Sequence, residues 1–336
     1  MATLTDIANA LGLNKTTVSK ALNGSSDISE STKEKVLGEA RRIGYVKHEK
    51  KLKEKARKQL IGIICPELTS YYYSQLVTGL SDHLHAKAFR TIVALSDFSA
   101  EREKECLQEL VSLNVCGLIV ITEESDIART IASVPNAQQL PIVVIGLNCT
   151  SREYDTVSVD EGYAVQQITD YLLSLGHQKF AFIGDKLVNS RLNYLIQQLE
   201  RRNIPLNRDA IILLDKRNEE CGYECMNRLL TQENRPTAVV AGYDTIALGA
   251  YRALTEHGLS IPEDLSLISF DDASFSQYLP CAMTTVSYDA ASECKVAAAI
   301  LLSRIHEGDS TFKQAAAIIP KLIIRQSTGV CPAPQP

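Results

Sequence analysis

The sequence predicts an α/β protein, in which an N-terminal three-helix helix-turn-helix domain precedes two doubly wound parallel-sheet lobes with a cleft between them. Three observations lead to this prediction. The chain has 336 residues, which is too long for one simple domain and suits two or three. Its first 45 residues hold three short helix patterns around a glycine-bearing turn, as in a helix-turn-helix. After residue 60, short apolar runs alternate with amphipathic helices, which is typical of parallel sheets covered by helices.

The three N-terminal helices follow from the spacing of apolar residues. Residues 5–11 and 15–22 are two short amphipathic segments, and Gly12 ends the first. Ser29 can cap a third helix that runs to about Ile43, and Gly44 ends it. The expected inward faces carry Leu4, Ile7, Ala8 and Leu11, then Val18, Ala21 and Leu22, then Val36, Leu37, Ala40 and Ile43.

The rest of the chain consists of repeated strand–helix units. The expected strands are 60–66, 90–95, 117–121, 141–146, 156–160, 179–184, 210–214, 238–242 and 265–270. The expected helices run to about 88 and over 101–113, 161–175, 190–202, 220–231 and 244–257. These strands are too many for one comfortable open sheet, so two lobes are the better interpretation.

Charge is distributed unevenly along the chain. Residues 1–60 hold 13 Lys and Arg against 7 Asp and Glu, a net +6, and the remainder holds 22 against 33, a net −11. A basic head on an acidic body favours a head that binds a polyanion such as nucleic acid. No apolar run reaches the length of a membrane span, and residues 1–6 show no signal-peptide pattern. We therefore expect a cytoplasmic protein without a membrane partner.

The sequence contains no pattern for an enzyme, a cofactor or a metal. Walker, G-x-G-x-x-G, H-E-x-x-H and G-x-S-x-G motifs are absent from it. Asp271 and Asp272 are adjacent, but neighbours on a strand point to opposite faces and cannot easily share a substrate. The nine cysteines are scattered, and Cys221 and Cys225 have no nearby His or Cys ligand. Reduced, buried thiols are therefore expected.

Residues 46–60 form a basic linker with seven basic and two acidic residues and no broad apolar stripe. Two interpretations remain open. The linker is either a solvated tether or a segment that becomes ordered on DNA phosphates.

Two stretches resemble the lactose-repressor/galactose-repressor family of bacterial transcriptional regulators. Residues 3–24 (TLTDIANALGLNKTTVSKALNG) are similar to its DNA-binding head, and residues 258–286 (GLSIPEDLSLISFDDASFSQYLPCAMTTV) to the end of its sensor core; residues 175–185 and 190–205 also fit. The resemblance implies a repressor of a carbohydrate-utilisation operon, bound to double-stranded operator DNA. It also implies that a small-molecule effector, held in a core similar to periplasmic binding proteins, controls DNA affinity. A homodimer is favoured over a tetramer, because no leucine heptad follows residue 329.

The resemblance also sets domain boundaries. The DNA-binding domain covers 1–45, the hinge linker 46–60 and the sensor core 61–329, and 330–336 are a tail expected to be disordered. The chain should cross between the lobes three times. Lobe one then holds 61–160 with 290–319, and lobe two holds 161–289 with 320–329.

The family pattern places the second helix in the major groove. Lys15, Thr16 and Lys20 would face base edges, where Lys donates to guanine and Thr can touch a thymine methyl. Short polar side chains suited to phosphate contacts, with helix capping as their other role, are Thr3, Asn14, Thr17, Ser19, Asn23, Ser29 and Thr32. The family usually has Arg at the position of Lys20. Lys lacks the bidentate fork of Arg, so base selectivity should be weaker or altered there.

The linker departs from the family pattern. Lys47 and His48 replace the usual Pro-Asn, and the leucine that enters the minor groove is replaced by Glu54 or shifted to Leu52. We therefore expect the linker to depend more on attraction between Lys and phosphate than on leucine insertion.

Candidate effector residues are carried over from the family one at a time. Arg191 matches its effector-binding arginine, and Asp271 matches its acceptor for ligand hydroxyl or N–H groups, at a strand end where such ligands bind. Tyr72 and Tyr73 match aromatic positions that stack on a ring; packing within the first helical turn is the alternative. Ser96, Asp97 and Thr122 also end strands.

Two further positions depart from the family. Tyr243 replaces a common Asn, and Arg217 stands where an aromatic residue is frequent. If Arg217 faces the cleft, two arginines favour an anionic effector such as a sugar acid or sugar phosphate over a neutral sugar. The alternative places Arg217 on a solvated loop.

Two other functions fit parts of the sequence. The core could bind a protein co-regulator instead of a metabolite, or the chain could be a sugar-binding protein without a DNA function. The basic head argues against the second of these.

Overall fold

The computed structural model describes residues 3–22, 24–45, 59–124, 126–146, 151–308 and 312–332. The chain separates into two compact units, residues 1–60 and residues 61–336.

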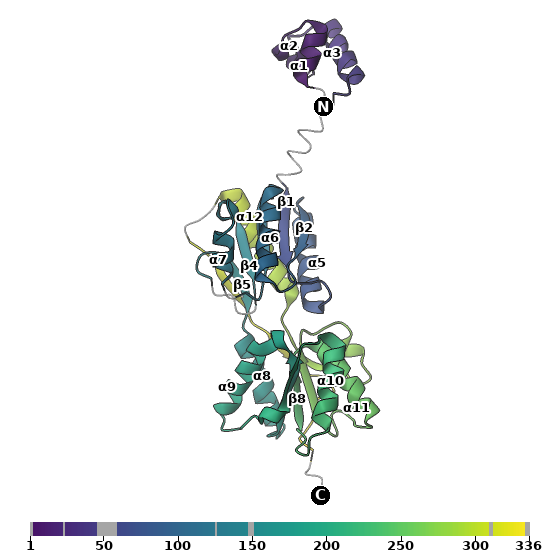
Figure 1. The fold of residues 1–336 in the computed structure, drawn as a ribbon, viewed down its shortest axis with the longest axis vertical. Helices are drawn as coiled ribbons and strands as arrows, with labels where there is room; N and C mark the ends of the chain where they lie inside the picture. Colours follow the sequence, from purple (N-terminus) through teal and green to yellow (C-terminus); the bar gives the residue numbers. More distant parts are fainter. Residues whose placement is uncertain are drawn as a thin grey trace. The chain divides into compact units, whose positions relative to one another are not determined.

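The first unit is formed by three helices (Figure 1): α1 (Leu4–Leu11), α2 (Lys15–Leu22) and α3 (Glu30–Arg42). Gly12 ends α1 with a φ of 63°, a left-handed conformation that favours glycine. Six expected inward residues are buried together, namely Ile7, Ala8, Val18, Ala21, Val36 and Ala40. The expectation for Leu37 is wrong, since this residue is 43% exposed. It follows buried Val36 and is therefore turned roughly 100° away from the core.

The first lobe of the second unit contains a six-stranded sheet in the order β11-β5-β4-β3-β1-β2. Its strands are β1 (Leu60–Cys65), β2 (Arg90–Leu95), β3 (Gly117–Ile121), β4 (Ile142–Ile145), β5 (Asp155–Val159) and β11 (Ala315–Ile318). Helix α5 (Tyr71–His85) packs against α12 (Ala290–Glu307), and α6 (Ala100–Ser112) against α7 (Ile127–Ala132). Strands β3 and β4 are buried throughout, which explains their continuous apolar sequences.

The second lobe contains another six-stranded sheet, in the order β12-β10-β9-β8-β6-β7. Its strands are β6 (Phe180–Asp185), β7 (Ile211–Leu214), β8 (Ala238–Ala241), β9 (Ser266–Phe270), β10 (Thr284–Ser287) and β12 (Lys321–Ile323). Helices α8 (Glu161–Ser174) and α9 (Asn189–Glu200) pack together, as do α10 (Asn218–Leu230) and α11 (Asp244–Glu256), on either side of this sheet (Figure 1). Short 3-10 helices cover Ala137–Gln139, Lys186–Val188, Arg208–Ala210 and Ser276–Tyr278.

The chain passes between the lobes three times. It leaves the first lobe after β5, returns between β10 and α12, and leaves again between β11 and β12. Strand β12 pairs antiparallel with β10, whereas β3, β4, β6, β8 and β9 form parallel pairs. The predicted fold class, a helical N-terminal domain and two parallel-sheet lobes, is confirmed.

One residue of the expected tail is bound to the core. The tail was predicted to be disordered from residue 330, but the amide of Cys331 donates to the carbonyl of Leu175 at 2.8 Å. This hydrogen bond ties the chain to the end of α8, so the prediction is wrong for Cys331. Residues 333–336 lie outside the described residues.

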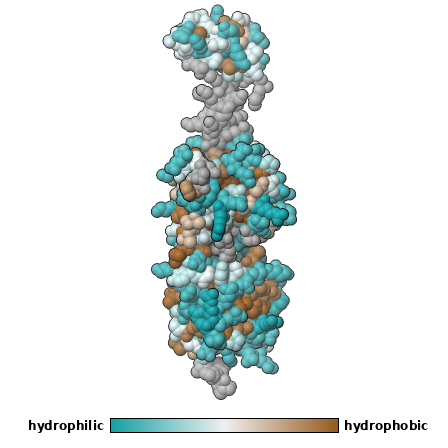
Figure 2. Space-filling model, turned by 90° about the vertical axis from the view of Figure 1, so that its left-hand side faces the viewer, coloured by the Kyte–Doolittle hydropathy of each residue, from teal (hydrophilic) through white to brown (hydrophobic). Residues whose placement is uncertain are grey.

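The surface of the two lobes is mixed in polarity. Figure 2 shows hydrophilic and hydrophobic residues interspersed on the face drawn. Among the described residues, no helix combines the length and apolar character needed to cross a membrane.

Candidate functional site

Helix α2 has one apolar side and one polar side. Val18 and Ala21 are buried against the neighbouring helices, which fixes the orientation of the helix. Lys15, Thr16 and Lys20 are exposed. Nζ of Lys20 lies 3.1 Å from Oδ2 of Asp27, and both side chains are at least half exposed. Such a surface ion pair is weak and can be exchanged for another anion.

The short polar residues of the first unit cap its helices. Thr3 accepts a hydrogen bond from the amide of Asp6, and Asp6 accepts one from the amide of Thr3, which forms a capping box. Asn14 accepts hydrogen bonds from the amide and hydroxyl of Thr17, both at 2.7 Å.

Ser29 caps α3 by accepting a hydrogen bond from the amide of Thr32. Ser19 lies half-buried on α2. The predicted residues Asn23 and Leu52 fall outside the described residues, as does most of the linker.

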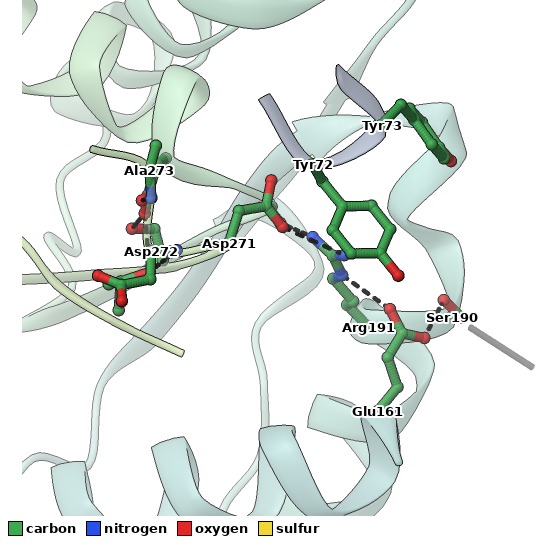
Figure 3. Close-up of polar contacts among 12 residues, drawn as sticks. Tyr72, Tyr73, Glu161, Ser190, Arg191, Asp271, Asp272 and Ala273 are labelled. Carbon is green, nitrogen blue, oxygen red and sulfur yellow. Dashed lines mark hydrogen bonds and ion pairs between the residues drawn. The ribbon is translucent and has the colours of Figure 1, made fainter. Parts of the chain in front are cut away.

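Arg191 lies at the centre of a cleft between the two lobes (Figure 3). It belongs to the first turn of α9, and its Nε donates to Glu161 at 2.8 Å. Its Nη1 donates to the carbonyl of Gly242. The guanidinium also stacks over the ring of Phe270, with its carbon 4.7 Å from the ring centre. Several partners thus hold the arginine in one orientation.

Asp271 faces Arg191 from the end of β9. Its φ is 96°, which is rare for a residue with a side chain and marks a candidate functional position. Its Oδ1 lies 3.8 Å from a nitrogen of Arg191, beyond hydrogen-bonding distance, and has no hydrogen-bond partner in the described part of the chain. Burial raises the pKa of Asp271 to about 7, although Arg191 opposes this shift.

The neighbouring carboxylate points elsewhere. Asp272 lies 2.6 Å from a nitrogen of Arg325. The carboxylates of the two aspartates make different contacts, but both residues line one further cavity, and the strand geometry expected for them is wrong. Both residues lie past the end of β9 with positive φ, rather than on a strand.

Tyr72 and Tyr73 contribute to the cleft from the first turn of α5. The hydroxyl of Tyr72 donates to Glu293 at 2.9 Å, and that of Tyr73 donates to Glu123 at 2.6 Å. Both tyrosines are 7% exposed. They pack within their own lobe and also line the cleft, and stacking on a ligand ring stays a prediction.

Arg217 and Tyr243 also line the cleft. Arg217 bridges the lobes. Its Nη2 lies 2.9 Å from Oε1 of Glu67 in the first lobe, and its Nε lies 3.2 Å from Oδ2 of Asp185 in the second. The hydroxyl of Tyr243 donates to Asp185 at 2.5 Å. Arg217 therefore faces the cleft rather than a solvated loop, but its charge is already neutralised by two carboxylates.

The remaining candidates lie outside this cavity. Asp97 is exposed and pairs with Arg102 at 2.8 Å. Ser96 and Thr122 are buried and line a second cavity beside the cleft.

Sequence reasoning missed three carboxylates. Glu123 and Glu161 line the cleft, and Asp185 holds Arg217 and Tyr243. Each lies at or just past the end of a parallel strand. The rule that selected Asp271 would have found all three if it had been applied to every strand.

Among the described residues, no group of three or more His, Cys, Asp and Glu side chains is placed to hold a metal ion. Cys221 and Cys225 lie buried on α10 with their sulfurs 3.8 Å apart.

Comparison with known proteins gives consistent results for both units. Residues 3–48 match the family "Bacterial regulatory proteins, lacI family", and residues 169–328 match "Periplasmic binding protein-like domain". The chain is 32% identical to the HTH-type transcriptional repressor PurR of Haemophilus influenzae (strain PittEE), covering 97% of this chain and 98% of the relative. It is 30% identical to the ribose operon repressor of Haemophilus influenzae, with the same coverage.

A solved structure shares the core. It is a LacI family transcriptional regulator from Enterococcus faecium with bound ribose, with a TM-score of 0.70 and 29% identity over 81% of this chain and 99% of that chain.

Proposed function

Because the chain belongs to the lacI family of bacterial regulatory proteins, we propose that it represses transcription by binding operator DNA through α2, under the control of a small molecule held between its two lobes. The observation that carries this proposal is the orientation of α2. Its apolar side is buried, and Lys15, Thr16 and Lys20 are exposed. A helix presented in this way can enter the major groove.

The DNA contacts follow from this orientation. Lys15, Thr16 and Lys20 would contact base edges, and the capping residues Thr3, Asn14, Thr17, Ser29 and Thr32 would bring helix N-termini to phosphates, with Ser19 beside them. Asn23 and Leu52, which lie outside the described residues, belong to the same proposal. A homodimer would place two α2 helices on the half-sites of a near-palindromic operator.

The proposed effector site is the cleft around Arg191 and Asp271. As the structure stands, its cavity has a volume of about 40 Å³, which is room for roughly three water molecules. A sugar therefore requires the lobes to move apart, or side chains such as Arg217 to change their contacts. Ligand binding would then alter the arrangement of the lobes, which is the physical requirement for control of DNA affinity. The ribose held by the Enterococcus faecium relative supports a sugar-like effector and a carbohydrate-utilisation operon.

The DNA-binding part can be tested by selecting duplexes from a random pool with the purified protein. We expect enrichment of one near-palindromic sequence. Lys15→Ala should weaken binding to that sequence by about tenfold or more, because one good base contact contributes about 1–3 kcal/mol. The control is Lys104→Ala on α6, an exposed lysine of the core, which should bind as the wild type does. Equal binding by the Lys15 variant would remove α2 from base recognition.

A further inference from the structure

A second cavity adjoins the cleft. It has a volume of about 150 Å³ and lies at the carboxyl ends of the strands of the first lobe, between Pro66, Ser96 and Thr122. The two cavities share Phe98, Glu123 and Leu187 among their lining residues. Once the cleft has widened, a single ligand longer than one sugar ring could therefore occupy both.

Each cavity contains one buried carboxylate oxygen without a hydrogen bond in the described part of the chain. In the cleft this atom is Oδ1 of Asp271, whose side chain is 8% exposed. In the second cavity it is Oε2 of Glu103, a residue that is 2% exposed. Leaving such an oxygen unsatisfied is costly, so each marks a place where a donor from a ligand would be stabilised.

The lining of the two cavities holds more carboxyl groups than cationic groups. The acidic residues are Glu103, Glu123, Glu124, Glu161 and Asp271, against Arg191 and Arg217. Both arginines are already paired, Arg191 closely with Glu161 and at 3.8 Å with Oδ1 of Asp271, and Arg217 with Glu67 and Asp185. An anionic ligand would have to displace these carboxylates and would add to the repulsion. The sequence-based preference for a sugar acid or sugar phosphate therefore loses its support.

Aromatic residues also line the two cavities. Tyr72, Tyr73 and Tyr243 border the cleft, and Phe98 borders both cavities. Aromatic faces beside carboxylates attract an ammonium group. We infer that the effector is a cationic amine, with an ammonium beside Asp271 and Glu123 in the cleft and a second hydrogen-bond donor at Glu103. Amino sugars and aliphatic diamines share this chemistry. The inference rests on the proposed function, because it assigns a ligand class to the same cleft.

Matched ligands that differ only in charge test the inference. The full-length protein is heated at pH 7.5 with D-glucosamine, D-glucose or D-glucuronate, and separately with putrescine, 1,4-butanediol or succinate. The cationic member of at least one series should raise the Tm by several degrees, as expected for a ligand well above its Kd, and the series that responds identifies the skeleton. Equal or greater stabilisation by a neutral or anionic member overturns the inference, and so does the absence of a shift with both amines at 10 mM, roughly 100 times a Kd of 0.1 mM.

A charge-removing variant tests the second contact. Glu103→Gln should weaken binding of the responding amine by about tenfold or more, because it removes a buried charged acceptor. Glu105→Gln, which changes an exposed residue on the same helix, should bind within about twofold of the wild type. Equal affinity of the Glu103 variant and the wild type overturns the assignment.

Measurement of operator binding distinguishes failure of the cationic inference from failure of the proposed function. If a neutral sugar binds and changes operator affinity, the proposed function stands and the cationic inference falls. If no compound changes operator affinity, the small-molecule part of the proposed function falls with it.

Discussion

Four carboxylic acids near the lobe interface are buried deeply enough to change their protonation near neutral pH. Burial is the first cause in each case. It raises the pKa of Glu103, Glu123 and Asp271 to about 7 and that of Glu293 to about 8. A raised pKa means that the folded state binds protons more tightly than the unfolded state, so these groups stabilise the fold when protonated. That stability is lost as the pH rises through the folded pKa.

We therefore predict that the Tm of the ligand-free protein falls as the pH is raised from 6.5 to 8. His177 does not contribute to this change. Burial lowers the pKa of His177, so the cost of protonating this residue appears only below its ordinary value of 6.5. Glu103→Gln should give a higher Tm at pH 8 and a shallower slope, as measured by differential scanning calorimetry. A Tm that is constant or rises over this window would show that these acids do not titrate in the folded protein.

The sequence predicted part of the site at this scale. Arg191, Asp271, Tyr72, Tyr73, Arg217 and Tyr243 all line the cleft. What the sequence could not supply is their charge state. Whether Arg217 is available to an anion depends on Glu67 and Asp185, and Glu67 comes from the other lobe, far from Arg217 in the sequence.

Helices α10 and α11 pack so closely that glycine is required at the contact. A Cβ built on Gly222 would lie 1.8 Å from the carbonyl oxygen of Ile246, and one on Gly249 would lie 1.9 Å from the carbonyl oxygen of Glu219. Both obstacles are backbone atoms, which cannot rotate away. The helices themselves must separate if either glycine acquires a side chain.

Gly222→Ala should therefore destabilise the core by about 3 kcal/mol, the upper end of the usual cost of overpacking. Urea unfolding of the full chain measures this change. Gly162→Ala on α8 is the matched control, because its Cβ would make only ordinary contacts at 3.4 Å and beyond. A Gly222 variant as stable as the Gly162 variant would contradict the close approach of the two helices.

Elements with strong local patterns could be predicted, and short edge elements could not. Strands such as β3 and β4 are continuous apolar runs because helices cover both faces of the sheet. Strands β11 and β12 have only four and three residues and are not fully buried. Their place in the sheets is set by pairing with β5 and β10, partners that are distant in the sequence. The sequence analysis expected no strand at either place, and the resemblance only assigned residues 290–319 and 320–329 to the two lobes.

At the scale of the whole molecule, the charge of each part of the chain fits the function that we propose for it, namely DNA binding by the N-terminal unit and effector binding by the core. The basic residues of 1–60 would attract DNA, whereas the acidic remainder would repel it. Within the core, Arg217 ties the second lobe to Glu67 of the first. Opening the cleft would break the ion pair between Arg217 and Glu67. A ligand that binds Glu67 or Asp185 in place of Arg217 would therefore shift the equilibrium between closed and open lobes.

The central claim is that occupancy of the cleft controls binding of DNA by α2. The most direct test is the affinity of the full-length protein for its selected duplex, measured by fluorescence anisotropy with and without each amine and sugar of the ligand series. We predict that one compound changes the Kd by at least about fivefold, the lower end of usual allosteric coupling, and that Asp271→Asn abolishes the change while leaving ligand-free DNA binding intact. Identical Kd values under all conditions would contradict the account.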